Sequence, residues 1–472
     1  MLRKSIKNVS PPVKASLFFM IGSVLQQSIN IITTPIFTRI LSQSDYGITN
    51  VYQSWYGILS VIITLSLTAG VYNNAMLDFK DELNEFTSSM LILTTLSTSI
   101  YFIIYIIFNQ QIANILNLPA ILIYTMFLAI LLNSAMGFWM AQQRFSYKYK
   151  LSVTISIFIT LFGAIFSYLL VINMDGNKAV EKIIGGFIFT GVISLILYIS
   201  IILKGKTGFN YRYWKYALGF NIPLIPHYLA SIVLAQSDRI IISKMVGNAE
   251  AGLYGVAYSS ASVISIVWTS INASWIPWTF KKMRDNQYGD IRKIANYIVI
   301  LCQIACVIFI SLAPEIIRIL AAPSYYKAVW VVPPVVLGVY FTFLYTLFAN
   351  IEFYYKKTKF IMVASIIGAI VNVVLNILLI PRFGYIAAAY TTLVAYMVFS
   401  FMHYFFMTRI NDKRIYDIKF IFLSSFILIL ASFGIMCLYD YFIIRYMIIA
   451  IVLIIILKKR RDIMLIVKQI KK

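Results

Sequence analysis

Residues 91–108 read LILTTLSTSIYFIIYIIF, and residues 443–457 read IIRYMIIAIVLIIIL. The first is a continuous apolar run and the second is apolar except for Arg445, and about 20 mostly apolar residues make a helix long enough to cross a lipid bilayer. Transmembrane strands would instead alternate apolar and polar residues over segments of about 10 residues. The runs therefore predict membrane-spanning helices.

The composition of the whole chain agrees with this prediction. Of its 472 residues, 61% are hydrophobic and 12% are charged, whereas soluble domains average about 45–50% apolar and about 25% charged residues. We predict an all-α integral membrane protein with about fourteen transmembrane helices. By hydropathy and length, the predicted spans are residues 15–38, 51–72, 88–108, 120–141, 151–173, 183–203, 217–238, 251–277, 293–313, 330–351, 360–380, 385–407, 418–439 and 441–457.

The basic residues indicate the orientation of these spans. The formal net charge is +23, and Lys and Arg collect in the cytoplasmic loops of membrane proteins. With the N-terminus inside, 31 of the 40 Lys and Arg residues fall on the cytoplasmic side. Both termini are therefore predicted to be cytoplasmic. Because the charge is spread from loop to loop rather than gathered in one patch, nucleic acid is excluded as a partner.

The sequence offers no candidate catalytic or metal centre. Cys302, Cys306 and Cys437 all lie in apolar runs, without accompanying histidines or carboxylates. The acidic residues of the predicted outer loops are isolated, and general acid–base chemistry needs positioned groups. We expect no metal and no cofactor, and a transporter rather than an enzyme. A membrane enzyme is the less favoured alternative.

Two pairs of segments suggest an internal duplication. Residues 38–47 read TRILSQSDYG and residues 243–252 read SKMVGNAEAG, so that a base, an acid and a glycine coincide at an offset of 205 positions. Residues 145–148 and 353–356 match at an offset of 208. Each copy would contain six spans, and an even number of spans makes both copies start on the same side of the membrane. The sequence therefore predicts two parallel six-helix repeats. The expected domains are residues 1–210, residues 211–410, and residues 411–472 with two extra helices and a basic tail. Chance similarity between apolar helices is the alternative.

The same segments carry a resemblance that covers nearly the whole chain. The residues concerned are Thr38–Ser42 with Tyr46 and Gly47, Asp238–Lys244, Gly252–Tyr254, Tyr354–Lys359, and Asn376 with Ile380–Gly384 and Ala387–Ala389. With them the chain resembles polysaccharide exporters of the Wzx O-antigen flippase type. These belong to the multidrug/oligosaccharidyl-lipid/polysaccharide (MOP) flippase superfamily.

The resemblance implies a MATE-like fold of two six-helix halves around a cationic cavity. Members of the family flip an undecaprenyl-diphosphate-linked oligosaccharide, such as an O-antigen or capsule repeat unit, to the outer leaflet of the bacterial inner membrane. Expected partners are this lipid-linked sugar, membrane lipids, a coupling ion (proton or sodium) and the polysaccharide polymerase machinery. Lipid II flippases look similar, but the chain lacks a clear Gly-Phe-Arg-Asp run after its first span. A multidrug exporter is a further alternative, and a membrane polysaccharide polymerase is a less favoured one.

Polar residues within the predicted spans are the candidates for a translocation site, because such residues are costly in a bilayer and usually face a cavity or a partner. The seventh span is the most polar. The candidates are Asn221, His227, Asp238, Arg239 and Lys244 in or after that span, Gln26, Asn30 and Arg39 in or after the first span, and Asn372 and Asn376 in the eleventh.

Each candidate also has a structural interpretation. Arg239 could extend to the outer headgroups, the amides could join neighbouring helices by hydrogen bonds, and His227 could be a structural histidine rather than a coupling group. Glu352 closes the tenth span near Lys356. We expect those two residues to form a solvated ion pair at the helix end.

Overall fold

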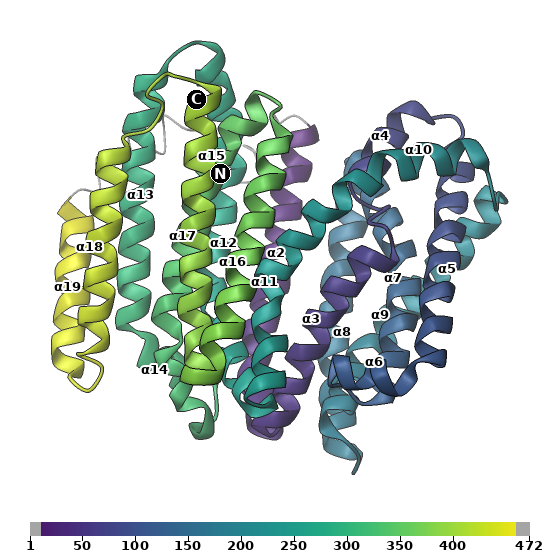
Figure 1. Cartoon of the computed structure of the whole chain (residues 1–472), viewed down its shortest axis with the longest axis horizontal. Helices are drawn as coiled ribbons and strands as arrows, with labels where there is room; N and C mark the ends of the chain where they lie inside the picture. Colours follow the sequence, from purple (N-terminus) through teal and green to yellow (C-terminus); the bar gives the residue numbers. More distant parts are fainter. Residues whose placement is uncertain (1–10, 459–472) are drawn as a thin grey trace. The chain divides into compact units, whose positions relative to one another are not determined.

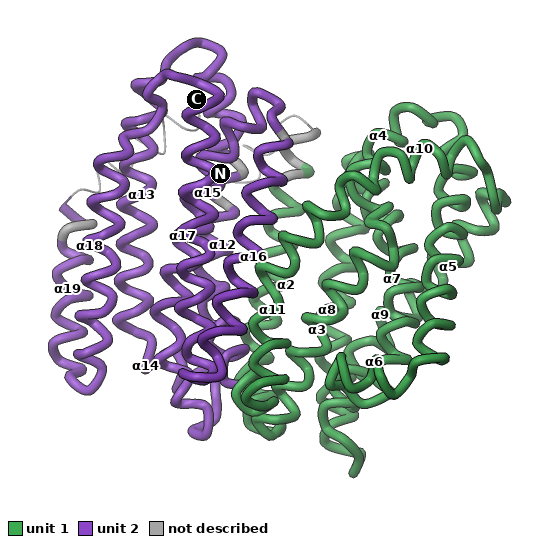
Figure 2. Tube along the Cα trace, in the orientation of Figure 1, with its two compact units in different colours: residues 1–252 green, residues 253–472 purple. Residues whose placement is uncertain are grey.

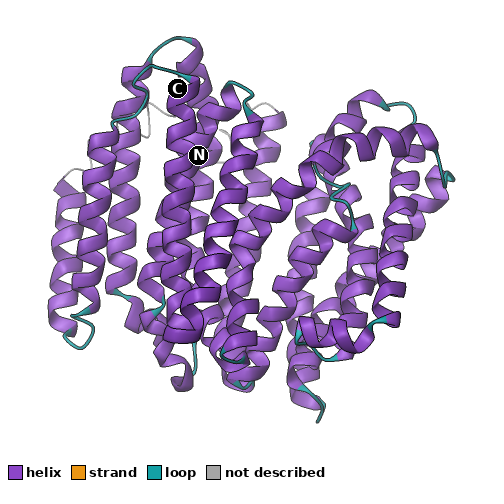
Figure 3. Cartoon of the chain, viewed as in Figure 1, coloured by secondary structure: helices purple, strands orange, loops and turns teal. Residues whose placement is uncertain are grey.

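The computed structural model describes residues 11–458, and the regular structure of this part is entirely helical, from α2 in purple to α19 in yellow (Figure 1). No strand occurs among these residues (Figure 3). The predicted all-α class is confirmed. Continuous apolar runs form helices here because a helix satisfies all of its backbone hydrogen bonds within the segment, as a bilayer requires.

The chain divides into two compact units, residues 1–252 and residues 253–472 (Figure 2). The helices of unit 1 are α2 (Pro11–Ile40), α3 (Gln43–Ile63), α4 (Gly70–Asp78), α5 (Leu83–Ile107), α6 (Asn109–Leu116), α7 (Ala120–Phe145), α8 (Tyr149–Asn173), α9 (Lys178–Gly205), α10 (Tyr211–Asn221), η2 (Ile222–Leu224) and α11 (Ile225–Met245). The predicted boundaries at residues 210 and 410 divide the chain by its predicted duplication and not into compact units. They stay predictions.

A long helix, α12 (Asn248–Arg284), begins in unit 1 and continues in unit 2. The other helices of unit 2 are α13 (Tyr288–Ser311), α14 (Ala313–Leu320), η3 (Pro323–Trp330), α15 (Val332–Tyr354), α16 (Thr358–Phe383), α17 (Tyr385–Ile410), α18 (Ile418–Met436) and α19 (Phe442–Lys458).

Among the described residues, twelve helices are long and apolar enough to cross a membrane. Each overlaps one of the fourteen predicted spans. The two remaining predictions, residues 51–72 and 441–457, fall on α3 and α19. The apolar part of α19, Phe442–Ile454, is shorter than the other candidate spans. In α3, polar residues near the start, including Gln43, Asp45 and Asn50, lower the hydropathy.

The predicted span over residues 51–72 is interrupted by a turn. α3 ends at Ile63 and α4 begins at Gly70, and between them Leu65 and Ser66 have φ angles of 53° and 51°. Residues other than glycine seldom adopt positive φ. Asn221 stabilises the turn, because its Nδ2 donates to the carbonyl oxygens of both residues at 2.9 and 2.8 Å.

An aromatic core joins α4, α5, α7 and α10 in unit 1. Tyr72, Phe86 and Phe138 are fully buried there, and the Tyr72 ring meets the Phe138 ring edge to face at 4.8 Å. Gln142 donates from Nε2 to the Tyr72 hydroxyl at 2.7 Å, so the buried phenol oxygen has a partner. Buried aromatic pairs of this kind each contribute about 0.5–1.5 kcal/mol beyond the area that they bury.

In unit 2, α15 is the central helix and packs along α17, which packs in turn along α16. The C-terminal helix α19 is held by Arg445, whose guanidinium donates twice to the Glu315 carboxylate of α14, both at 2.8 Å. Partial burial opposes ionisation of Glu315, but these hydrogen bonds prevail and lower the pKa of its carboxyl. The bidentate pair therefore ties α19 to the rest of the unit.

Candidate functional site

Two ionisable residues of α11 are buried. Asp238 is fully buried, and Arg239 is 8% exposed. The helix that carries them packs along α3. Charges are rarely buried unless a partner or a function compensates the lost hydration. The burial of Arg239 argues against the interpretation in which it extends to the headgroups.

The Arg239 guanidinium donates hydrogen bonds to neutral acceptors. Its Nη1 donates to the carbonyl oxygen of Ala235 at 3.1 Å and to Oε1 of Gln236 at 3.0 Å. The same Gln236 oxygen accepts from the Ser54 hydroxyl of α3 at 3.2 Å. The side chain of Arg239 is thus oriented by α11 and α3 together.

The other two predicted cations have different surroundings. Arg39 is the second-last residue of α2 and Lys244 the second-last of α11, and both are exposed. Arg39 Nη1 donates to the carbonyl oxygen of Pro35 at 2.7 Å. Of these three cations, Arg239 alone is buried. Arg39 and Lys244 are exposed at the ends of helices, which suits long-range attraction of an anion better than direct binding.

A fourth cation, Lys182 of α9, was not predicted as a site residue, because the predicted spans placed it in an outer loop. Its Nζ lies 4.3 Å from the centre of the Tyr46 ring and 4.8 Å from that of Phe37. It also donates to the Thr49 hydroxyl at 3.2 Å. No carboxylate of the described residues lies within ion-pair distance of Nζ. Cation–π contacts contribute about 2 kcal/mol when desolvated.

The remaining candidates of unit 1 differ in burial. Both amide hydrogen-bond donations of Asn221 go to the turn after α3, which favours its structural interpretation. His227 is half-buried, with its ring 5.7 Å from that of Tyr228. On α2, Gln26 is half-buried and Asn30 is exposed. These assignments to a translocation site stay predictions.

In unit 2, Asn372 and Asn376 lie one turn apart on α16 and are in contact. Both are fully buried, and Asn376 Nδ2 donates to Asn372 Oδ1 at 3.2 Å. Asn372 Nδ2 donates to the Thr392 hydroxyl of α17 at 3.0 Å, and the Thr391 hydroxyl donates to Asn376 Oδ1. These hydrogen bonds join α16 to α17, which favours helix packing over direct contact with sugar hydroxyls.

The expectation for Glu352 was wrong. Rather than forming a solvated pair with Lys356, its side chain is fully buried, and Oε1 lies 2.8 Å from Nδ1 of His403 on α17. His403 is fully buried as well. The sequence could not indicate this pair, because its members are 51 residues apart and lie on different helices.

An apolar groove of about 390 Å³ runs between α15, α17 and α18 of unit 2. Its lining is almost entirely aliphatic and aromatic. The residues that line it include Phe341, Leu344, Phe348, Met397, Phe401, Phe422 and Phe426. A groove of this character suits an acyl or isoprenoid chain.

The two segments of the predicted repeat meet within unit 1. A Cβ atom added to Gly47 would lie 1.7 Å from the carbonyl oxygen of Asn248, and one added to Gly252 would lie 2.4 Å from that of Gln43. Gln43 and Asn248 are themselves 205 positions apart. Reciprocal contacts are typical of segments related by two-fold symmetry, so this contact supports the predicted duplication.

Twelve candidate spans, with buried ionisable side chains within them, define a multi-pass membrane protein. The fold is that of lipid II flippase MurJ, inward closed conformation, at a TM-score of 0.67 and 16% identity over 96% of this chain and all of that one. An inward-facing multidrug resistance MATE family transporter of the MOP superfamily has a TM-score of 0.63 and 12% identity over 81% of this chain and 94% of that one. The predicted MATE-like fold is confirmed.

The chain belongs to the family described as polysaccharide biosynthesis protein, whose pattern matches residues 13–283. A relative from Haemophilus influenzae, protein 1 of the Lsg locus, is 23% identical over 379 residues, which cover 76% of this chain and 89% of the relative. An uncharacterised membrane protein of the same organism is 21% identical over 369 residues, which cover 76% of this chain and 88% of that protein.

Proposed function

We propose that the protein is a flippase that moves a polyprenyl-diphosphate-linked oligosaccharide from the cytoplasmic to the outer leaflet by alternating access. Membership of the polysaccharide biosynthesis family carries this proposal. The MOP-type fold supports transport rather than catalysis. The substrate we favour is an undecaprenyl-diphosphate-linked O-antigen or capsule repeat unit.

The buried cations supply the chemistry that such a substrate needs. A diphosphate is too strongly charged to cross hydrocarbon unaided. Guanidinium groups bind phosphate oxygens bidentately, and Arg239 is enclosed with neutral acceptors among its partners. Lys182 would add a second cation in unit 1, held by aromatic rings. In this proposal the sugar and the diphosphate enter the protein while the lipid tail stays in the membrane.

The membrane potential would favour export of the anion. At about 100 mV, inside negative, each negative charge that leaves the cytoplasm gains about 2.3 kcal/mol. A diphosphate carrying two charges would gain about twice that, with or without inward movement of a coupling ion. We propose that the protein lies in the bacterial inner membrane with both termini cytoplasmic, where it would deliver its product to the polymerase machinery.

The two C-terminal helices favour a lipid-linked substrate over a small drug. The similarity to MurJ extends over 96% of the chain, whereas that to the MATE transporter extends over 81%. The apolar groove involves α18, which lies outside the two predicted six-helix repeats. A polyprenyl tail needs such a surface and a small cationic drug does not. A lipid II-type substrate is the second candidate, on the strength of the full-length fold similarity.

A direct binding measurement separates these substrates. Purified protein should bind undecaprenyl-diphosphate-linked sugar, and it should not bind the small cation ethidium. Arg239→Ala should weaken the first affinity by about tenfold or more, since loss of a charge-assisted hydrogen bond costs about 1.5–3 kcal/mol. Ethidium binding that does not depend on Arg239 would instead indicate a multidrug exporter.

A further inference from the structure

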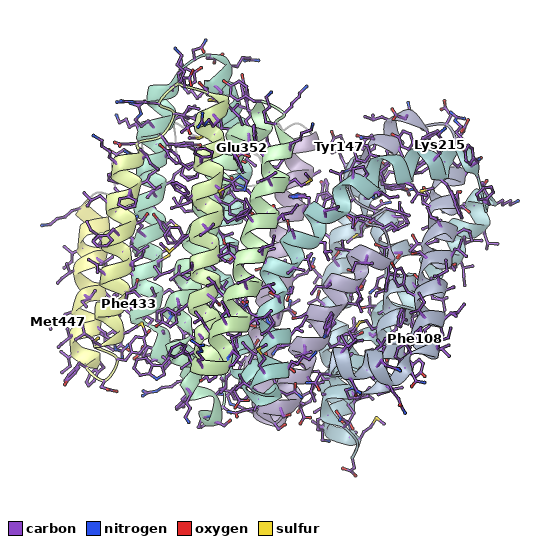
Figure 4. The ribbon with its side chains drawn as sticks, viewed as in Figure 1. Phe108, Tyr147, Lys215, Glu352, Phe433 and Met447 are labelled. Carbon is purple, nitrogen blue, oxygen red and sulfur yellow. The ribbon has the colours of Figure 1, made fainter. Side chains whose placement is uncertain are left out.

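The buried pair of Glu352 and His403 stands apart from the cations of unit 1. Glu352 lies in the last turn of α15 and His403 in the second half of α17, and both side chains are 0% exposed (Figure 4 labels Glu352). The 2.8 Å distance between Oε1 and Nδ1 is that of a strong hydrogen bond. An acid and a base are therefore in direct contact inside unit 2.

Aromatic rings enclose the imidazole. The Tyr345 ring stacks on it at 5.3 Å, and the Phe399 ring meets it edge-on at 4.6 Å. Of the two side chains, Oε2 of Glu352 and Nε2 of His403 are buried without a hydrogen-bond partner among the described residues. Buried polar atoms are nearly always satisfied, so such a pair is unusual unless it has a use.

Among the other ionisable groups in the described part of unit 2, Tyr345 contacts the pair through its ring, which stacks on the imidazole. Those on the elements packed against α15 and α17 include Tyr340, Tyr354, Tyr404 and Arg409 on these helices, Asp290, Arg292, Lys293, Tyr297, Cys302 and Cys306 on α13, Lys359 and Arg382 on α16, Lys419 on α18, and Tyr325, Tyr326 and Lys327 on η3. No hydrogen bond, ion pair or ring contact in the described part of the chain joins any of them to Glu352 or His403.

The charge balance of the pair depends on one proton. With a single proton shared between the carboxyl and the imidazole, the pair has no net charge. Removal of this proton leaves a net negative charge, and addition of a second leaves a net positive charge. Both changes place an uncompensated charge in a buried site, which is strongly disfavoured. The proton can therefore exchange readily only when the site opens to water.

We propose that Glu352 and His403 form a proton-binding site that exchanges its proton when α15 and α17 change their packing, so that the conformational cycle of unit 2 is linked to proton movement. The link to transport rests on the flippase function proposed above, whereas the binding of the proton does not. Because both residues lie toward the C-terminal ends of their helices, the predicted topology places the site nearer the cytoplasmic side.

The proton itself is the probe for the first test. The chain has two histidines, so in a His227→Gln variant labelled with ¹⁵N-histidine and placed in lipid nanodiscs the imidazole signal belongs to His403. We expect the Nδ1 signal to be that of a nitrogen that shares a proton with a carboxyl group. Glu352→Gln, which keeps the shape of the side chain, should move this signal to the position of a neutral imidazole nitrogen. The same Nδ1 signal in both proteins would overturn the proton site.

A second test addresses the link to transport. In proteoliposomes, the wild-type rate of lipid-linked oligosaccharide flipping should change by about threefold or more between about pH 6 and about pH 8. The Glu352→Gln rate should be nearly independent of pH. Asp290→Asn makes the same chemical change at a surface ion pair with Lys282 and serves as the control, with the wild-type profile expected. Wild-type pH dependence in Glu352→Gln would refute the link. An Nδ1 proton shared with Glu352, in a chain that flips no lipid-linked sugar, would refute the proposed function and leave the proton site standing.

Discussion

Replacing Arg239 by alanine should abolish surface polysaccharide in cells that depend on this protein, at normal levels of the protein in the membrane. The substitution removes a buried guanidinium that we propose pairs with the diphosphate, and loss of one partner of a buried charge pair costs about 2–5 kcal/mol. Arg239→Lys should retain part of the glycan, because it keeps the charge but loses bidentate geometry. The measurement is surface glycan per molecule of membrane protein.

The matched control for this experiment is Arg284→Ala. Arg284 ends α12, and its side chain is 75% exposed. The same chemical change at that position should leave glycan at the wild-type level, since exposed ion pairs contribute little. Wild-type glycan from Arg239→Ala would contradict the assignment and leave Arg239 with a structural role.

The second large effect is expected at Gly47. An alanine Cβ there would lie 1.7 Å from the carbonyl oxygen of Asn248, which is backbone and cannot rotate away. We expect Gly47→Ala to destabilise the protein by roughly 3 kcal/mol or more, since overpacking that displaces backbone is among the costlier substitutions. The yield of monodisperse protein and its Tm in detergent measure the effect.

The same helix offers a control for Gly47. A Cβ added to Gly57 of α3 would lie 3.6 Å from Ile232, which is ordinary van der Waals contact. Alanine also favours a helix over glycine by about 1 kcal/mol. Gly57→Ala should therefore leave the Tm unchanged or raise it slightly. Equal behaviour of the two variants would mean that the close approach at Gly47 does not exist.

Hydropathy predicted most of the helices, because the length of an apolar run is a property of the segment itself. It failed at residues 51–72, where Leu65 and Ser66 form a turn within apolar sequence. The residue that stabilises this turn, Asn221, lies 155 or more positions away. A window that reads one segment at a time cannot detect such a partner.

The same limit explains the outcome for the candidate sites. Arg239 was singled out because it directly follows the most polar predicted span, residues 217–238. Lys182 could not be recognised, because its aromatic neighbours Phe37 and Tyr46 come from α2 and α3. Glu352 was interpreted from its place near a helix end, whereas its burial is decided by α17, which carries His403. Contacts between helices, rather than local sequence, determine these roles.

The proposed function requires that the protein itself moves a diphosphate-linked sugar across a bilayer. The direct measurement uses purified protein in sealed vesicles that contain a fluorescent undecaprenyl-diphosphate-linked oligosaccharide and an external quencher that does not cross the membrane. Wild-type vesicles should lose the protected part of the fluorescence much faster than protein-free vesicles, and Arg239→Ala vesicles should behave like protein-free ones. A wild-type rate equal to that of protein-free vesicles, under an imposed potential as well as without one, would contradict the account.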